Sequence, residues 1–312
     1  MSKITMKSNT NQTFDEAFEK FIRKCKVKNL TEKTIRSYEQ KIRPFKKYLE
    51  CTDIELKNIN SDTIDDFIVW VRNEYNVNDI STNSILRTVR AFSYYCMANG
   101  YIVRFKVHIP KATKKMKETY SDYELSLLLK KPNKKECTFT EFKIWTFENF
   151  LIGTGVRLST ALDIKIKDIK FDENLIFLGQ TKNRVQQYIP LSRTLACVLR
   201  EYLEIRGGES TDYLFCNNYG CKGNERTFQQ MVADYNRNRG IERTSIHAFR
   251  HTFARLYILN GGNAFILQKL MGHSEISVTK EYVDLFGTDL SVGYERLNPL
   301  DSLSTRGNYI RM

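Results

Sequence analysis

The sequence predicts a mainly α-helical protein with two domains, the second of which also contains a small β-hairpin. Three observations lead to this fold class. Apolar residues recur at helical spacing through most of the 312-residue chain. A proline-containing, lysine-rich segment at 106–119 predicts an extended basic linker that divides the chain in two. Two short β-prone runs, Leu175–Leu178 and Tyr188–Ile189, flank a polar stretch and predict the hairpin.

The first domain, 13–105, follows a flexible N-terminus at 1–12 and is predicted to be a compact bundle of four helices. Its first helix begins at a capping box formed by Thr13 and Glu16. Asn99 and Gly100 give the last helix a typical C-terminal stop. The four predicted helices cover about 13–25, 31–48, 61–71 and 81–98.

The second domain, 120–286, opens with another capping box, formed by Ser121 and Glu124. A C-terminal tail at 287–312 follows it. The predicted helical segments of the second domain beyond this capping box are Phe142–Leu151, Arg226–Asn238, His247–Leu259, Ala264–Met271 and Ser277–Leu285.

The charge balance favours a polyanionic partner. The chain has 49 Lys and Arg against 36 Asp and Glu, a formal net charge of +13, and a sequence pI near 9.3. A basic protein with no nucleic-acid role is the alternative that charge alone leaves open.

Cysteine usage and the N-terminus predict a cytoplasmic protein with no membrane role. The seven cysteines form no disulfide framework and no zinc-finger spacing, so we expect reduced thiols. The first residues contain no apolar signal core, and no run of about 18 apolar residues occurs.

Three of the four histidines lie between positions 247 and 273, beside an arginine. In the stretch TSIHAFRHTF, His247 and His251 have a spacing that could hold a metal, whereas His247 and Arg250 could together bind a phosphate. The metalloprotease pattern requires glutamate directly after the first histidine, and here Ala248 occupies that position. The sequence therefore favours the phosphate, and it predicts neither a metal nor a nucleotide cofactor.

The tyrosine recombinases, the phage-integrase and Xer-type superfamily, have a signature that resembles residues 245–286, SIHAFRHTFARLYILNGGNAFILQKLMGHSEISVTKEYVDLF. Their pattern is a His-x-x-Arg-His block, a later Gly-His, and a tyrosine nine residues after that histidine. Gly272, His273 and Tyr282 match it. TGVRLSTALDIKIKDI resembles the family's first arginine block, and IFLGQTKNRVQQYIPL resembles its lysine hairpin. The resemblance covers about 13–290 and implies a helical, SAM-like core-binding domain followed by a mixed α+β catalytic domain.

The resemblance also implies roles for individual residues, and their chemistry agrees. Tyr282 would be the nucleophile that forms a 3′-phosphotyrosine. Two arginines would neutralise the charge that develops on the phosphorus. Lys182 would protonate the leaving oxygen, although Arg184 nearby leaves that role open. His247 would hydrogen-bond the phosphate and assist proton transfer to or from the tyrosine, and His273 would donate to a non-bridging oxygen. The full catalytic set implied is Arg157, Lys182, His247, Arg250, His273 and Tyr282.

Two neighbouring positions complete this prediction. His251 is predicted to be a packing or supporting residue, because it directly follows Arg250 and shares the face of His247 and Arg250 only in part. The family usually has an acidic residue three positions after its first arginine. Here that position is Thr160, and Asp163 lies three residues further on.

DNA is expected to be held by cations on two helices of the first domain and by the linker. Each could instead be a solvated surface charge. The candidate contacts are Lys33, Arg36, Lys41, Arg43, Asn83, Ser84, Arg87, Arg90 and Lys114.

The sequence thus predicts a site-specific recombinase that cuts and rejoins double-stranded DNA for a mobile element or in Xer-like resolution. The short segment before Thr13 argues against an extra arm-binding domain. In the family, a tail like 287–312 packs on a neighbouring protomer. A homotetramer on synapsed DNA is therefore expected, with a monomer or dimer when free and a possible accessory or partner recombinase. The alternatives are a type IB topoisomerase-like enzyme and a non-catalytic DNA-binding regulator.

Overall fold

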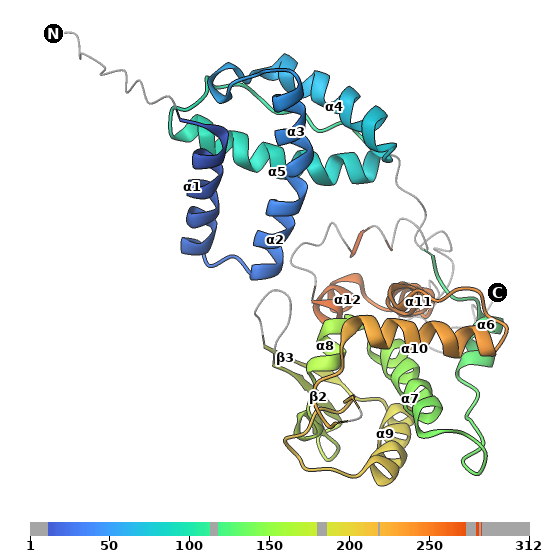
Figure 1. Ribbon diagram of the computed structural model, residues 1–312. Helices are drawn as coiled ribbons and strands as arrows, with labels where there is room; N and C mark the ends of the chain where they lie inside the picture. The colour runs from blue at the N-terminus through green and yellow to red at the C-terminus, as the bar shows by residue number, and fades with distance from the viewer. Residues whose placement is uncertain are drawn as a thin grey trace, which may run out of the picture. The chain divides into compact units, whose positions relative to one another are not determined.

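The computed structural model describes residues 12–112, 118–179, 186–217, 219–272, 279, 280 and 282. The chain falls into two compact units, 1–115 and 116–312 (Figure 1). Both are mainly helical, and the second also contains a three-stranded sheet, which confirms the predicted fold class. Within the described residues, no helix is long and apolar enough to cross a membrane.

The described residues of the first unit form five α-helices and a short 3-10 helix. They are α1 (Phe14–Val27), α2 (Glu32–Lys41), α3 (Arg43–Cys51), η1 (Leu56–Asn58), α4 (Ser61–Tyr75) and α5 (Asp79–Ala98). The Thr13 capping box forms as predicted, with both reciprocal hydrogen bonds. The single helix predicted over 31–48 was wrong, because the chain turns at Ile42 between α2 and α3. Pro44 explains the break, since it has no N–H and its ring would collide with the carbonyl of Gln40 in a continuous helix.

Aromatic side chains form much of the first core. Phe92 of α5 is 1% exposed and contacts the rings of Phe14, Phe18 and Phe21 on α1, at centroid distances of 5.1–5.8 Å. The start of the predicted linker also packs here, because Val107 is buried in the same core. The bundle therefore extends past α5 into the chain that follows it.

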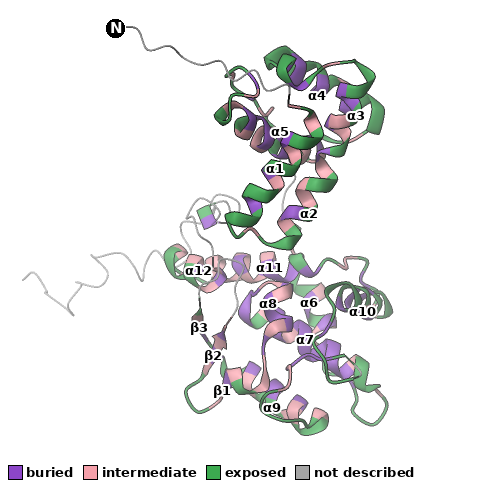
Figure 2. Cartoon of the chain, turned by 60° about the vertical axis from the view of Figure 1, so that its left-hand side comes forward, coloured by how far each residue is buried: buried purple, intermediate pink, exposed green. Residues whose placement is uncertain are grey.

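The second unit is built around one central helix, α7. The helices among its described residues are α6 (Asp122–Leu128), α7 (Phe139–Thr154), α8 (Leu158–Asp163), η2 (Ile166–Asp168), α9 (Arg193–Arg206), α10 (Glu225–Asn238), α11 (Ile246–Leu259) and α12 (Ala264–Met271). Buried residues lie on most sides of α7, as Figure 2 shows, and α9, α10 and α11 pack around it. A helix that is apolar on all sides belongs in the interior. The Ser121 capping box forms at the start of α6, as predicted.

The sheet is antiparallel and consists of β1 (Ile169–Lys170), β2 (Leu175–Leu178) and β3 (Gln187–Pro190). The predicted hairpin is confirmed by the pairing of β2 with β3, in which Ile176 lies opposite Ile189 and both are buried. Strand β1 and helix α9 were not predicted. The hairpin residues 180–185, which include Lys182, lie outside the described part of the chain.

Candidate active site

Two arginines, Arg157 and Arg250, contact the same backbone carbonyl where α8, α11 and α12 come together. Arg250 of α11 is 6% exposed, and its guanidinium donates to the carbonyl oxygens of Gly155, at 2.6 Å, and Met271, at 2.8 Å. Arg157, the residue that caps the start of α8, makes a longer contact of 3.5 Å with the same Met271 oxygen. One carbonyl at the end of α12 therefore brings both guanidinium groups together.

The electrostatics of this pair favour an anion. Burial lowers the pKa of Arg250 to about 10, and the positive charge of Arg157 contributes to that shift. Burial also lowers the pKa of Arg157. Both groups still carry their proton at neutral pH, so two like charges lie close together in a poorly solvated place. An oxyanion bound between them relieves the repulsion and can accept several charged hydrogen bonds.

Tyr282 lies beside the arginines. It is 2% exposed and packs in a small cluster with Ala254, Leu267 and Met271. Its phenol influences the pKa of both Arg157 and Arg250, which places it within electrostatic reach of the pair. The structure thus brings together three predicted catalytic residues that are far apart in the chain.

His251 contacts the tyrosine directly. Its Nδ1 lies 2.8 Å from the Tyr282 hydroxyl oxygen, and the ring centroids are 5.8 Å apart. The sequence predicted only a packing or supporting role for this residue. His251 and Ala254 are three residues apart on α11 and therefore share a helix face. This spacing could have predicted that both contact the same residue, here Tyr282.

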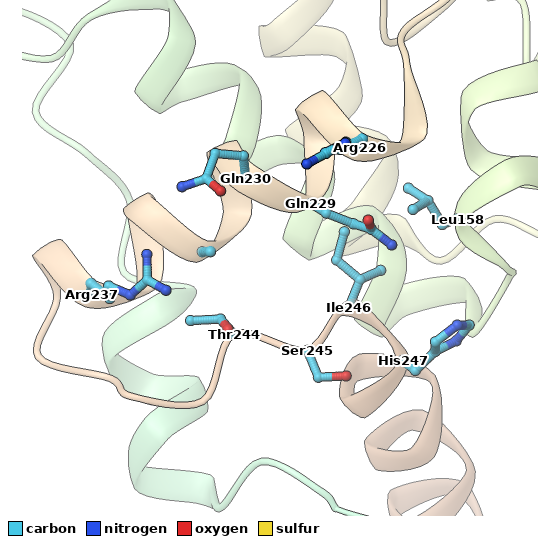
Figure 3. Close-up of a pocket in the computed structure, with 10 residues that line it drawn as sticks. Leu158, Arg226, Gln229, Gln230, Arg237, Thr244, Ser245, Ile246 and His247 are labelled. Atoms are coloured by element: carbon cyan, nitrogen blue, oxygen red, sulfur yellow. The ribbon is translucent and has the colours of Figure 1, made fainter. Parts of the chain in front are cut away.

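His247 lies in the first turn of α11 and is exposed. It lines the edge of a depression of about 400 Å³ between α10 and the segment that enters α11 (Figure 3). Leu158, which directly follows Arg157, lines the same depression, so its edge lies next to the arginine site. The remaining lining residues are Arg226, Gln229, Gln230, Ala233, Arg237, Thr244, Ser245 and Ile246. His273, Lys182 and Lys114 lie outside the described residues.

A buried hydrogen-bond network fixes α11. The Tyr120 amide donates to Thr252 Oγ1 at 2.8 Å, and its hydroxyl lies 3.3 Å from the Ser245 carbonyl oxygen at the start of α11. Asn236 of α10 donates to that hydroxyl at 3.1 Å. Burial raises the pKa of the nearby Glu148 carboxyl well above its ordinary value. These buried hydrogen bonds therefore fix the position of α11, the helix that carries Arg250 and His251.

Both units of the chain match known protein families. The family model for the phage integrase SAM-like domain matches residues 13–116, and the model for the phage integrase family matches residues 121–288. The chain belongs to the phage integrase family. It is a tyrosine site-specific recombinase, which confirms the predicted enzyme class.

Relatives of the recombinase extend over most of its length. A probable integrase/recombinase of Acholeplasma phage L2 is 29% identical over 217 residues, which are 69% of this chain and 74% of the relative. Tyrosine recombinase XerD of Pseudomonas aeruginosa is 25% identical over 282 residues, 87% of this chain and 93% of the relative. The solved structure of a Tn1549 transposon integrase in complex with transposon right end DNA has a TM-score of 0.71 at 19% identity. It covers 87% of this chain and 94% of that one and shows a shared fold.

The usual acidic position of the family is filled differently in this recombinase. Thr160 is 6% exposed on α8. Asp163, one turn later, forms an ion pair with Lys222, so it attaches the 216–222 loop to α8. Within the described part of the chain, no group of three or more His, Cys, Asp or Glu side chains is arranged to hold a metal.

Apart from Lys114, the predicted DNA-contacting residues lie on α2, α3 and α5 of the recombinase, and α2 packs against α5. Lys33, Arg36, Arg43 and Arg87 are exposed, whereas Lys41, Ser84 and Arg90 are half-buried. Asn83, another predicted DNA contact, is buried in the bundle. It is 5% exposed, and its amide donates to the Pro110 carbonyl at 2.7 Å, so it fixes the start of the linker to the bundle.

Gly155 is expected to be indispensable to this site. It ends α7 at a φ of +64°, and an added Cβ would lie 2.2 Å from the Phe253 ring of α11. Gly155→Ala should destabilise the recombinase by about 2–5 kcal/mol, because the left-handed backbone and the clash both cost free energy. In thermal unfolding, the Tm should fall by roughly 5–15 °C.

The matched control is Gly240→Ala. Gly240 has a similar φ of +75°, but an added Cβ there meets nothing within 4 Å. The control should show only the backbone cost. Equal decreases of Tm in the two variants would contradict a clash with Phe253.

Proposed function

We propose that this recombinase cuts and rejoins duplex DNA through a covalent bond between Tyr282 and a 3′ phosphate. The observation that carries the proposal is the convergence of Tyr282, Arg157 and Arg250 at one buried, positively charged place. Two fixed guanidinium groups suit a phosphodiester, whose transition state gains negative charge on its non-bridging oxygens.

In the first step, Tyr282 Oη attacks the phosphorus. The Oη–P bond forms and the P–O5′ bond breaks, and the 5′ oxygen leaves as a hydroxyl after taking a proton. Lys182 is the proposed donor of that proton, and His247 and His273 are proposed to hydrogen-bond the phosphate. Attack by a 5′ hydroxyl on the phosphotyrosine reverses the step. The bond energy is conserved, so the exchange requires no energy cofactor.

The biological role we propose is integration or excision of a mobile element. The phage relative and the transposon integrase structure support it. The XerD relative supports Xer-like resolution as the second candidate. We also propose a homotetramer on synapsed DNA, with the tail 287–312 as a contact between protomers, and a monomer or dimer in the free state. A solved relative described as a lambda integrase tetramer bound to a Holliday junction supports this assembly. The proposed compartment is the cytoplasm.

Trapping the covalent intermediate tests the proposal. The protein is incubated with nicked duplexes that tile the genomic DNA flanking its gene, because release of the short fragment beside the nick prevents religation. A slow-migrating adduct on a denaturing gel is expected, and peptide mapping should place the DNA on Tyr282. No adduct on any duplex, or an adduct on another tyrosine, would contradict the proposal.

Cations of α5 should contribute to DNA affinity. The double substitution Arg87→Ala, Arg90→Ala should weaken binding and lower the slope of log K against log salt by about 0.9 for each phosphate that the protein no longer neutralises. Gel-shift titrations at several salt concentrations measure this. Lys135→Ala, at an exposed position of the second unit, serves as the control. An unchanged slope in the double variant would exclude these two residues as phosphate-binding groups.

A further inference from the structure

His251 contacts the hydroxyl oxygen of Tyr282, which is the atom that has to lose its proton when it attacks the phosphorus. Tyr282 Oη cannot bond to phosphorus and keep its hydrogen, so a nearby group has to accept a proton as the bond forms. Such a group has to lie within hydrogen-bond distance of the hydroxyl. His251 Nδ1, at 2.8 Å, meets that requirement.

The two arginines near the tyrosine cannot perform this step. Arg157 and Arg250 are cations at neutral pH and have only N–H donors, so they can stabilise an oxyanion but not receive a proton. A neutral imidazole with its hydrogen on Nε2 leaves Nδ1 free of hydrogen and able to accept. The hydroxyl of Tyr282 then donates to His251 Nδ1.

We propose that His251 is the catalytic base for Tyr282, an inference that rests on the proposed function. As the Oη–P bond forms and the P–O5′ bond breaks, the phenol proton passes to Nδ1 and leaves an imidazolium. In the reverse reaction, the imidazolium returns that proton to the departing tyrosine oxygen. The 5′ oxygen exchanges its own proton with a separate donor, so charge and atoms balance in both directions.

The fold supports this role through α11. Arg250 and His251 are consecutive on one helix, and Thr252, the next residue, is tied to the Tyr120 backbone amide. The same rigid helix therefore fixes both the guanidinium that holds the phosphate and the imidazole that holds the nucleophile. Catalytic groups perform best when supporting contacts lock their positions in this way.

Two substitutions separate proton acceptance from simple positioning. In His251→Asn, the side-chain amide oxygen can still accept a hydrogen bond near the Nδ1 position, but it cannot take up a proton at neutral pH. His251→Ala removes both functions and leaves room for a small molecule. The assay is the rate of adduct formation on the nicked duplex that the wild-type protein cleaves, with DNA affinity and Tm measured in parallel.

Both variants should form the adduct about 10²–10³-fold more slowly than wild type, since general-base catalysis contributes that much. DNA affinity should stay within about twofold, and added imidazole should restore about tenfold in His251→Ala only. A rate within about threefold of wild type in either variant would overturn the inference. If wild-type protein forms the Tyr282 adduct and His251→Asn matches it, only the inference fails. If the wild type forms none, the proposed function fails.

A measurement without DNA tests the contact if a variant does not fold. In protein labelled with ¹⁵N-histidine, the Nδ1 resonance of His251 should move on Tyr282→Phe, while the resonances of His108 should not. An unmoved His251 signal would show that the hydrogen bond is absent and would overturn the inference.

Discussion

Tyr282→Phe should reduce formation of the covalent DNA adduct by at least about 10⁴-fold, because it removes the only atom of the side chain that can bond to phosphorus. Recombination should disappear with it. The substitution is close to isosteric, and the ring remains in the cluster of Ala254, Leu267 and Met271. The effect should therefore be confined to chemistry, which denaturing gels on nicked duplex and native gel shifts on intact duplex measure separately.

The stability of this variant should change little. The hydrogen bond to His251 that it removes is worth about 0.5–1.5 kcal/mol. Tyr257→Phe is the matched control, since Tyr257 packs against the same cluster and has no proposed role in cleavage. We expect wild-type adduct from the control. Adduct of wild-type amount from Tyr282→Phe would mean that another tyrosine is the nucleophile.

Much of the arrangement was predictable from the sequence, since it depends on local patterns. Capping boxes at Thr13 and Ser121 mark helix starts because the cap and its partner are only three residues apart. The hairpin follows from two β-prone runs. Arg157, Arg250 and Tyr282 were predicted because the motifs that contain them resemble those of the tyrosine recombinases and occur in the same order along the chain. The helical spacing of apolar residues alone does not predict which side chains these three residues contact in the folded protein.

What could not be predicted depends on contacts between distant segments. Asn83 has the polarity of a DNA-contacting residue, and its hydrogen bond to Pro110, 27 residues away, gives it a structural role that the local sequence does not indicate. His251 acquires its partner 31 residues further along the chain. A helical pattern indicates which side of α11 is buried, but not which polar group from another segment meets it there.

Arg250→Ala should lower the rate of DNA cleavage by about 10³-fold or more, since fixed donors to a transition-state oxyanion have effects of that size. It should also cost stability. The Gly155 carbonyl would lose its charged donor, which costs about 1–3 kcal/mol for a buried group left unsatisfied. The Met271 carbonyl would keep its longer contact with Arg157. Relief of the repulsion with Arg157 offsets part of this cost.

Arg157→Ala is the informative comparison. The contact of Arg157 with Met271 is longer than that of Arg250, and the side chain is half-buried, so its removal should impair cleavage with a smaller decrease of Tm. Arg250→Lys should not rescue cleavage, because a single ammonium cannot replace a planar group that reaches two carbonyls and a phosphate.

Inorganic phosphate offers a test of the anion site that requires no DNA. An anion that binds the folded state raises the Tm, so phosphate should stabilise the wild-type protein more than it stabilises either arginine variant at equal ionic strength. Chloride at matched ionic strength controls for general salt effects. Equal phosphate shifts in all three proteins would show that the arginine pair does not bind the anion. The slower cleavage by Arg250→Ala would then reflect the broken hydrogen bonds among α7, α11 and α12.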